Sequence, residues 1–125
     1  MLKELSIRNF AIIDELSVEF KQGLTVLTGE TGAGKSIIID AVHILAGGRS
    51  SVDFIRHGTK KAELTGLFEL PTGDHPIYPK LEEAGIEVEE GTVILRRDLQ
   101  DNGKSTCRIS NRIVHLTVLR EIGGS

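Results

Sequence analysis

The stretch Gly29-Glu30-Thr31-Gly32-Ala33-Gly34-Lys35-Ser36 decides the fold of this chain. It satisfies the pattern G-x-x-x-x-G-K-[ST] at every fixed position. Residues 24–28 before it form a short β-rich run without a polar face, which predicts a central strand covered on both sides. Residues 37–46 after it are apolar almost all round a helical wheel and are followed by Gly47-Gly48, which predicts a mostly buried helix that stops there. A glycine-rich turn between a strand and a helix predicts a P-loop.

The residue types in this loop fit a bound triphosphate. Glycine at positions 29, 32 and 34 lets the backbone wrap closely around an anion, with amides pointing inward and the helix N-terminus facing the phosphates. We expect Lys35 to reach the β- and γ-phosphates of ATP and Ser36 to be a ligand of Mg²⁺. Glu30, Thr31 and Ala33 complete the site, with Thr31 and Ala33 contributing chiefly backbone amides. The alternative, a glycine-rich turn that fits the pattern by chance, is disfavoured by the flanking strand and helix.

Length and composition indicate one soluble domain over residues 1–125. Hydrophobic residues make up 39% and charged residues 26%, as in ordinary globular proteins. No apolar run approaches the roughly 20 residues that span a bilayer, and the first residues do not resemble a signal peptide, so we expect a cytoplasmic protein without membrane contact. Cys107 is the only cysteine, which excludes an internal disulfide. We expect Cys107 to serve simply as a small residue in a strand. The four histidines lack metal-ligand spacing, so we interpret them as structural or surface residues.

Alternation of apolar and polar residues predicts several strands outside the P-loop. Two opening strands, around residues 5–8 and 16–21, are expected to pair antiparallel, and another strand covers 62–70. Strands at 93–99, 106–110 and 113–115 form a meander, with an Asn-Gly hairpin turn at 102–103 and a joint at Asn111-Arg112. Residues 76–84 predict a short exposed helix. Thr117 can cap a final helix that begins at Val118.

The net charge of −3 does not favour nucleic-acid binding by the chain as a whole, but basic residues are concentrated toward its C-terminal end. One interpretation is a phosphate-tracking face on the meander. The favoured alternative is pairing with the acidic stretch 82–90, or simple solvation. The bases concerned are Arg96, Arg97, Lys104, Arg108 and Arg112.

Three groups of motifs resemble the RecN family of bacterial DNA repair ATPases. They are the opening 5–12, the segment from Gly23 through Ser36, and the runs Gly47-Gly48-Arg49, 95–98 and 119–123. This family is SMC-like, with a split ABC-type ATPase head whose halves sit at opposite ends of a long coiled coil. The resemblance implies an α/β P-loop NTPase fold, here the N-terminal lobe of the head, with a central P-loop strand and helix plus an antiparallel β-meander.

The resemblance also implies a function in recombinational repair of DNA double-strand breaks, in a nucleoid-associated protein. Partners would be DNA, the C-terminal lobe of the same head, and a second head that closes on ATP. No hydrophobic strand ending in Asp or Glu follows the P-loop, and the family's Walker B acids and signature motif have no counterpart in these residues. We therefore expect ATP hydrolysis by the full-length protein but not by this chain alone.

Family precedent suggests further site residues. Arg8 and Asn9, beside Phe10, would help to seat the nucleotide's base, whereas composition alone equally allows a polar strand edge with Phe10 in the core. Arg49 and Arg56 follow the P-loop helix where related heads place an arginine that touches DNA or the ATP site; the alternative for each is a solvated loop residue.

Two other functions remain open at this stage. Another SMC-like or ABC-type DNA-handling head would share the P-loop, although the amino-acid sequence of residues 29–36 favours the RecN family. A small P-loop kinase or NTPase would need a catalytic acid and a lid within these residues, and the sequence presents neither.

Overall fold

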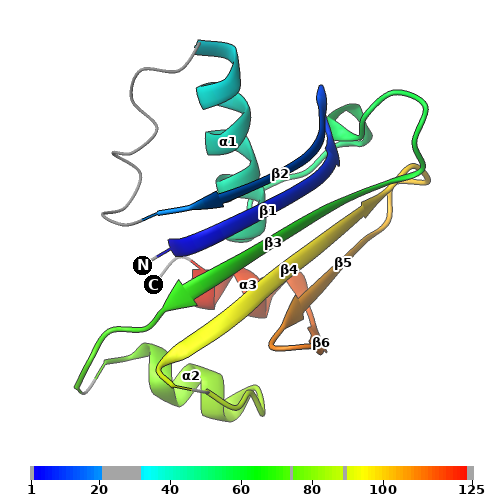
Figure 1. Ribbon diagram of the computed structural model, residues 1–125. Coiled ribbons are helices and arrows are strands. Elements are labelled where there is room, and N and C mark those ends of the chain that lie inside the picture. The colour runs from blue at the N-terminus through cyan, green and yellow to red at the C-terminus, as the bar shows by residue number, and fades with distance from the viewer. Residues whose placement is uncertain (1, 21–31, 74, 89, 124–125) are drawn as a thin grey trace.

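The computed structural model describes residues 2–20, 32–73, 75–88 and 90–123, and its centre is a six-stranded antiparallel sheet (Figure 1). The strand order is β2-β1-β3-β4-β5-β6, so the chain turns back on itself beside each strand it has just made, apart from the excursion between β2 and β3. The bounds are β1 Leu2–Phe10, β2 Ile13–Glu19, β3 Lys61–Glu69, β4 Thr92–Gln100, β5 Ser105–Ile109 and β6 Arg112–Val114.

The two opening strands pair antiparallel, as predicted, and β1 also pairs with β3. Leu5 and Ile7 are buried while Ser6 and Arg8 are exposed, so the period-two pattern of the sequence divides the strand into a covered and an open face. Gly66 of β3 lies on the covered face, where a Cβ would stand 2.5 Å from Leu45 Cδ2. The missing side chain therefore lets a helix approach the sheet closely.

The predicted meander is confirmed, with a shift at one turn. The β4–β5 turn uses Gly103 at φ 89°, and Asn102 Oδ1 accepts a hydrogen bond from the Lys104 amide at 2.9 Å. The β5–β6 turn is Ser110-Asn111, both with positive φ (48° and 69°), so the predicted joint at Asn111-Arg112 was wrong by one residue. The type I′ twist of a two-residue hairpin needs positive φ at both central positions, and Asn111 tolerates it.

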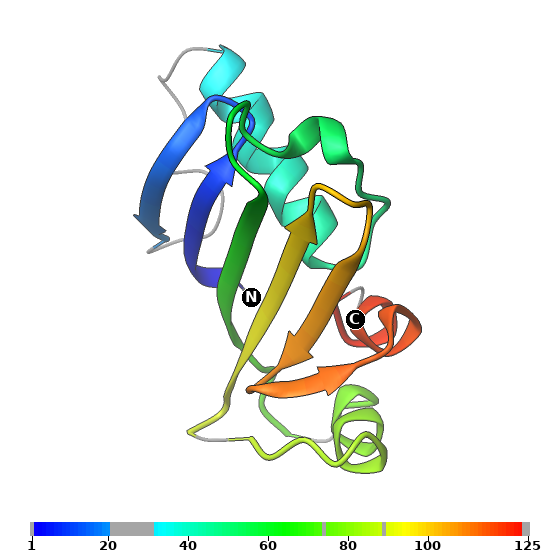
Figure 2. The same ribbon diagram turned by 90° about the vertical axis from the view of Figure 1, so that its right-hand side faces the viewer.

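Helix α1, Gly32–Leu45, is the predicted P-loop helix, and Figure 2 shows it packed on one face of the sheet together with α3. Ile38, Ala41, Ile44 and Leu45 face the sheet and are buried. Its other side is open, since Ile39 is 47% exposed and Asp40 and His43 are exposed as well. The prediction of a mostly buried helix therefore holds for the side of α1 that faces the sheet and is wrong for its other side.

The two short helices differ from their predictions in burial and length. Helix α2, Ile77–Glu83, was expected to be exposed, but Ile77 and Leu81 are buried because they pack toward the core. Helix α3, Leu116–Gly123, begins before Val118, and the His115 carbonyl accepts the amides of Val118 and Leu119 at 3.0 and 3.2 Å. Thr117 therefore lies inside the first turn and is not the cap.

The 3₁₀ turn η2, Val52–Phe54, links α1 to β3. The predicted strand at 24–28 lies outside the described residues. Within the described ranges, no helix is long and apolar enough to cross a membrane.

Candidate nucleotide-binding site

The predicted phosphate loop falls partly on described residues. Residues 29–31 lie outside them, as do the side chains of Lys35 and Ser36. The backbone of Gly32 through Ser36 forms the beginning of α1, and the first turn of this helix contains no acidic residue. The first amides of any helix lack acceptors within it and sit at the positive end of the dipole, so this end of α1 fits a phosphate group.

The β1–β2 turn holds the predicted base-seating residue Asn9 in an unusual conformation. Its φ is 54°, and φ of Ala11 is also 54°. Both Figure 1 and Figure 2 place this turn at the end of the sheet where α1 begins. The turn is fixed from outside, because the Asn9 carbonyl accepts the Arg56 amide at 2.8 Å and the Ala11 amide donates to the Phe54 carbonyl at 2.6 Å.

Phe10 strengthens this attachment from the core. It is fully buried, and its ring stacks on Phe54 with centroids 5.2 Å apart and planes 4° apart. Offset aromatic pairs of this kind contribute about 1 kcal/mol beyond their burial. The structure thus joins the segment that carries Asn9 to the segment that carries Arg56, although they are distant in sequence.

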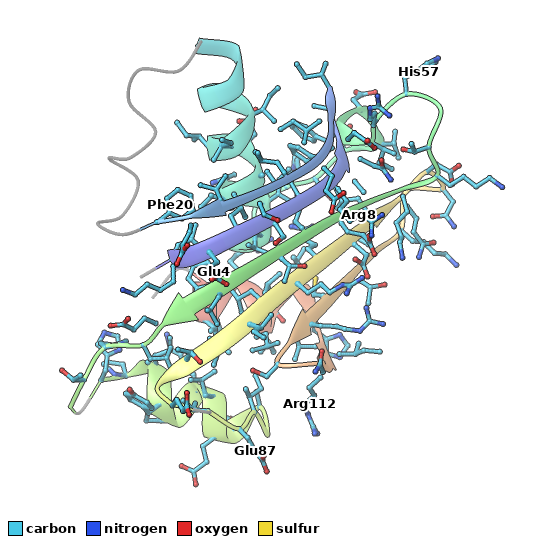
Figure 3. All side chains as sticks on the ribbon, viewed as in Figure 1. Glu4, Arg8, Phe20, His57, Glu87 and Arg112 are labelled. Atoms are coloured by element: carbon cyan, nitrogen blue, oxygen red, sulfur yellow. The ribbon has the colours of Figure 1, made fainter. Side chains whose placement is uncertain are left out.

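Arg8 lies on the open face of the sheet (Figure 3), where its Nε is 3.9 Å from Glu63 Oε2 and its side chain is 61% exposed. At that distance and exposure the ion pair adds little stability. The polar strand edge with a buried Phe10, one of the two sequence interpretations, matches what the structure shows for Arg8 and Phe10.

Arg49 and Arg56 are separated by the fold. Arg49 is exposed and follows the turn at the C-terminal end of α1. Arg56 lies against the β1–β2 turn, where its Nη1 is 3.8 Å from Asp14 Oδ1. Only Arg56 is thus at the end of the molecule where α1 begins.

The five basic residues near the C-terminal end do not form one face. The interpretation as a phosphate-tracking face and the alternative of pairing with 82–90 or solvation were therefore both wrong in part. Arg96 Nη2 pairs with Glu63 Oε1 at 2.6 Å, and Arg96 Nε and Arg108 Nη1 pair with the two oxygens of Asp98 at 3.1 and 3.0 Å. These partners lie on β3 and β4 and not in 82–90. Lys104 is exposed in a turn.

Arg112 stands apart from the other bases, beside Gly85. It lines a shallow cavity of about 330 Å³ between 85–87 and the β5–β6 turn. Figure 3 shows its side chain extending from the far end of β6, away from the middle of the sheet.

Arg97 is the fifth base, and sequence reasoning missed its role. It is 2% exposed and lies on the covered face. Its Nη1 donates to the carbonyls of Ile44 (2.8 Å) and Gly48, and its Nη2 donates to Ser50 Oγ at 3.2 Å. Burial lowers the pKa of Arg97 from its usual value. The available signal was strand periodicity, because Arg97 shares its face with Leu95 and Leu99.

No cluster of three His, Cys, Asp or Glu side chains with metal-binding geometry occurs in the part of the chain that the structure describes. His57 extends into solvent from the loop before β3 (Figure 3). Cys107 lies in a strand, β5, as predicted. It is buried there, and burial raises the pKa of its thiol.

Comparison with known proteins adds to this geometry. A profile of the AAA domain family matches residues 4–119. DNA repair protein RecN from Bacillus subtilis is 58% identical over 98% of this chain and 21% of its own length, and RecN from Halalkalibacterium halodurans is 57% identical over 100% and 22%. The chain thus spans about a fifth of the length of these relatives.

Among solved structures, a protein from work on ATP-driven dimerization and DNA-stimulated activation of SMC ATPases superposes with a TM-score of 0.74. It shares 23% identity, and the match covers 97% of this chain and 76% of that one. At this identity the likeness concerns the fold alone.

Proposed function

Because the chain belongs to the AAA domain family and is RecN-type in sequence, we propose that it is the ATP-binding N-terminal lobe of a DNA repair ATPase head. The observation that carries the proposal is a complete P-loop sequence at the start of α1, in a chain 58% identical to a RecN protein. The function is recombinational repair of DNA double-strand breaks by a cytoplasmic, nucleoid-associated protein.

Each part of the loop has a separate task in binding Mg²⁺ and ATP. The backbone amides from Gly29 to Ser36 hold the phosphate oxygens, and the dipole of α1 adds to this attraction. Lys35 compensates the negative charge of the β- and γ-phosphates, and the Ser36 hydroxyl binds the metal ion that links them. Magnesium supplies further charge neutralisation on the phosphates when bound.

The β1–β2 turn forms the neighbouring part of the site. Asn9 seats the nucleotide's base, with Arg8 on the adjoining face. Three features support the role of Asn9: its positive φ, the hydrogen bond from the Arg56 amide to its carbonyl, and the stacking of Phe10 on Phe54. Together they hold the turn in one conformation before a nucleotide binds. Arg56 is the better placed of the two candidate arginines for contact with DNA or the ATP site.

Hydrolysis depends on groups beyond these residues. A P-loop needs a second acidic ligand for magnesium and a group that orients water. We assign these to the C-terminal lobe of the same head and to a second head that closes on ATP, with DNA as the macromolecular partner. The exposed side of α1, with Ile39 in its middle, is where the C-terminal lobe would pack.

Replacement of the P-loop lysine tests the proposal. We expect Lys35→Ala to abolish measurable binding of Mg·ATP, measured by titration calorimetry, while circular dichroism stays unchanged. The loss follows because one point charge on the β- and γ-phosphates disappears. Lys104→Ala, which removes an exposed turn lysine, is the matched control and should bind as the parent does. Equal ATP affinity in Lys35→Ala and the parent would contradict the proposal.

A further inference from the structure

Two arginines, the buried Arg97 and the exposed Arg120, hold the C-terminal end of α1. Arg97 from β4 donates to the carbonyls of Ile44 and Gly48, and Arg120 Nε from α3 donates to the Gly47 carbonyl at 3.2 Å. We call Arg97 and Arg120 the arginine clamp. Cations are favoured at this end of a helix because the last carbonyls are unpaired and carry the negative end of the dipole.

The turn that the clamp holds has little room to move. Gly47 has φ 105°, and a Cβ there would stand 2.6 Å from Arg120 Cα. A Cβ on Gly48 would stand 2.5 Å from the His43 ring. Gly47 thus allows α3 to approach the end of α1 so closely that its carbonyl faces the Arg120 guanidinium, and Gly48 lets the chain pass close to His43.

Arg97 is costly to bury, which indicates a specific task. It is 2% exposed, and its Nε is buried without a hydrogen-bond partner among the described residues. Burial lowers the pKa of Arg97 most, Cys107 offsets part of that fall, and Arg120 lowers the pKa by a smaller amount. An apolar residue would fill this face of β4, beside Leu95 and Leu99, without that penalty.

The task that fits is axial positioning of α1. Apolar contacts between α1 and the sheet are non-directional, so burial of Ile38, Ala41 and Ile44 alone tolerates sliding of the helix along the sheet. Hydrogen bonds from one rigid guanidinium to two carbonyls and a hydroxyl are directional and fix both position and rotation. A helix is stiff and rises about 1.5 Å per residue, so a shift at its C-terminal end appears in full at its N-terminal end.

We propose that Arg97 is a positioning residue for nucleotide binding, which sets how far the N-terminus of α1 reaches toward the phosphates. The proposal rests on the proposed binding of ATP at residues 29–36. Arg97 does not touch the nucleotide; it acts through α1. Arg120 joins the same end of α1 to α3 and completes the clamp.

The test compares neighbouring arginines in the full-length protein, below the melting temperature of each variant. In Arg97→Met we expect the dissociation constant of Mg·ATP to rise roughly tenfold to a hundredfold, the range for the loss of one hydrogen bond to a charged phosphate. Tripolyphosphate, which has no base or sugar, should lose affinity by the same factor, because the change acts at the P-loop. Arg96→Met, on the open face of the same strand, is the matched control and should bind both ligands as the parent does.

Each outcome decides the matter. If Arg97→Met binds both ligands as the parent does while Lys35→Ala binds neither, the positioning role is overturned and the proposed function stands. If Lys35→Ala keeps parental affinity, the proposed function fails and the positioning role fails with it. A weakened ATP affinity with unchanged tripolyphosphate affinity also overturns the role.

Arg97→Lys keeps the experiment decisive if Arg97→Met does not fold. One ammonium group cannot reproduce the fork that binds Ile44, Gly48 and Ser50 together, so we expect a severalfold loss of affinity in the folded Lys variant. Parental affinity in that variant would overturn the proposal.

Discussion

Arg96 and Arg97 are neighbours in β4, yet the two faces of the sheet use them in opposite ways. Arg96 lies on the open face, where its side chain is 38% exposed and pairs with Glu63 and Asp98. Arg97 lies on the covered face, is 2% exposed, and binds backbone carbonyls at the end of α1. One face pairs charge with charge, and the other pairs a charge with the end of a helix.

This difference shows that the face of a strand decides the role of a basic residue more than its neighbours in sequence do. On the open face, water competes for every ion pair, so single pairs contribute little. On the covered face, water is largely excluded, so a lost hydrogen bond is not replaced by one to water. Substitutions on each face test whether this difference in stability contribution exists.

The largest expected effect is on stability when Arg97 is removed. Arg97→Ala should lower the free energy of unfolding by about 3 kcal/mol, because two carbonyls lose a donor and a cavity opens beside α1. Arg96→Ala should lower it by less than about 1 kcal/mol, as is typical of exposed ion pairs. Urea denaturation of both variants and the parent measures the difference. Equal losses in the two variants would remove the distinction between the faces.

A smaller effect is expected at Asp98, which is the most enclosed charge of the open face. Its side chain is 5% exposed and accepts from Arg96 Nε and Arg108 Nη1. Asp98→Asn should cost about 1–2 kcal/mol, since two charge-assisted hydrogen bonds weaken together.

A double-mutant cycle isolates that contribution. Asp98→Asn combined with Arg108→Gln should show a coupling energy of roughly 0.5 kcal/mol or more, measured by urea denaturation, because the two groups are in contact. Strict additivity of the two single changes would mean that the open-face network adds nothing.

Much of the fold could be predicted from residue patterns. Alternation in β1, β3 and β4 marked the strands, and Asn102-Gly103 marked a hairpin, since both signals are local. The start of α3 and the burial of α2 were mistaken for a different reason. They depend on contacts between distant segments, such as Ile77 and Leu81 with the core, which no local pattern records.

The candidate site was predictable in its motif but not in its supports. Residues 29–36 carry their chemistry in their order, whereas the attachment of Asn9 to Arg56 arises from a tertiary backbone hydrogen bond. Arg97 was grouped with Arg96 because charge was counted along the chain. Residues 95, 97 and 99 of a strand share one face, so the alternation in β4 places Arg97 with Leu95 and Leu99 and apart from Arg96.

The smallest expected effect concerns Cys107, which lies opposite Arg97 on the covered face. Burial raises the pKa of its thiol above its usual value, and Arg97 offsets part of that rise. The folded chain therefore keeps the thiol proton to a higher pH than the unfolded chain does. This contribution to stability is complete below the unfolded pKa and is lost as the pH rises through the folded pKa.

Comparison of the parent with Cys107→Ala isolates the effect, because other groups titrate in both proteins. Between about pH 8 and about pH 10, the free energy of unfolding should fall more steeply in the parent, by at most about 1.4 kcal/mol per pH unit for one proton. Urea denaturation under reducing conditions at several pH values gives both slopes, and any cavity left by the substitution cancels because it does not depend on pH. Identical slopes would show that the covered face does not exclude water around Cys107, and the contrast between the two faces would then rest on Arg97 alone.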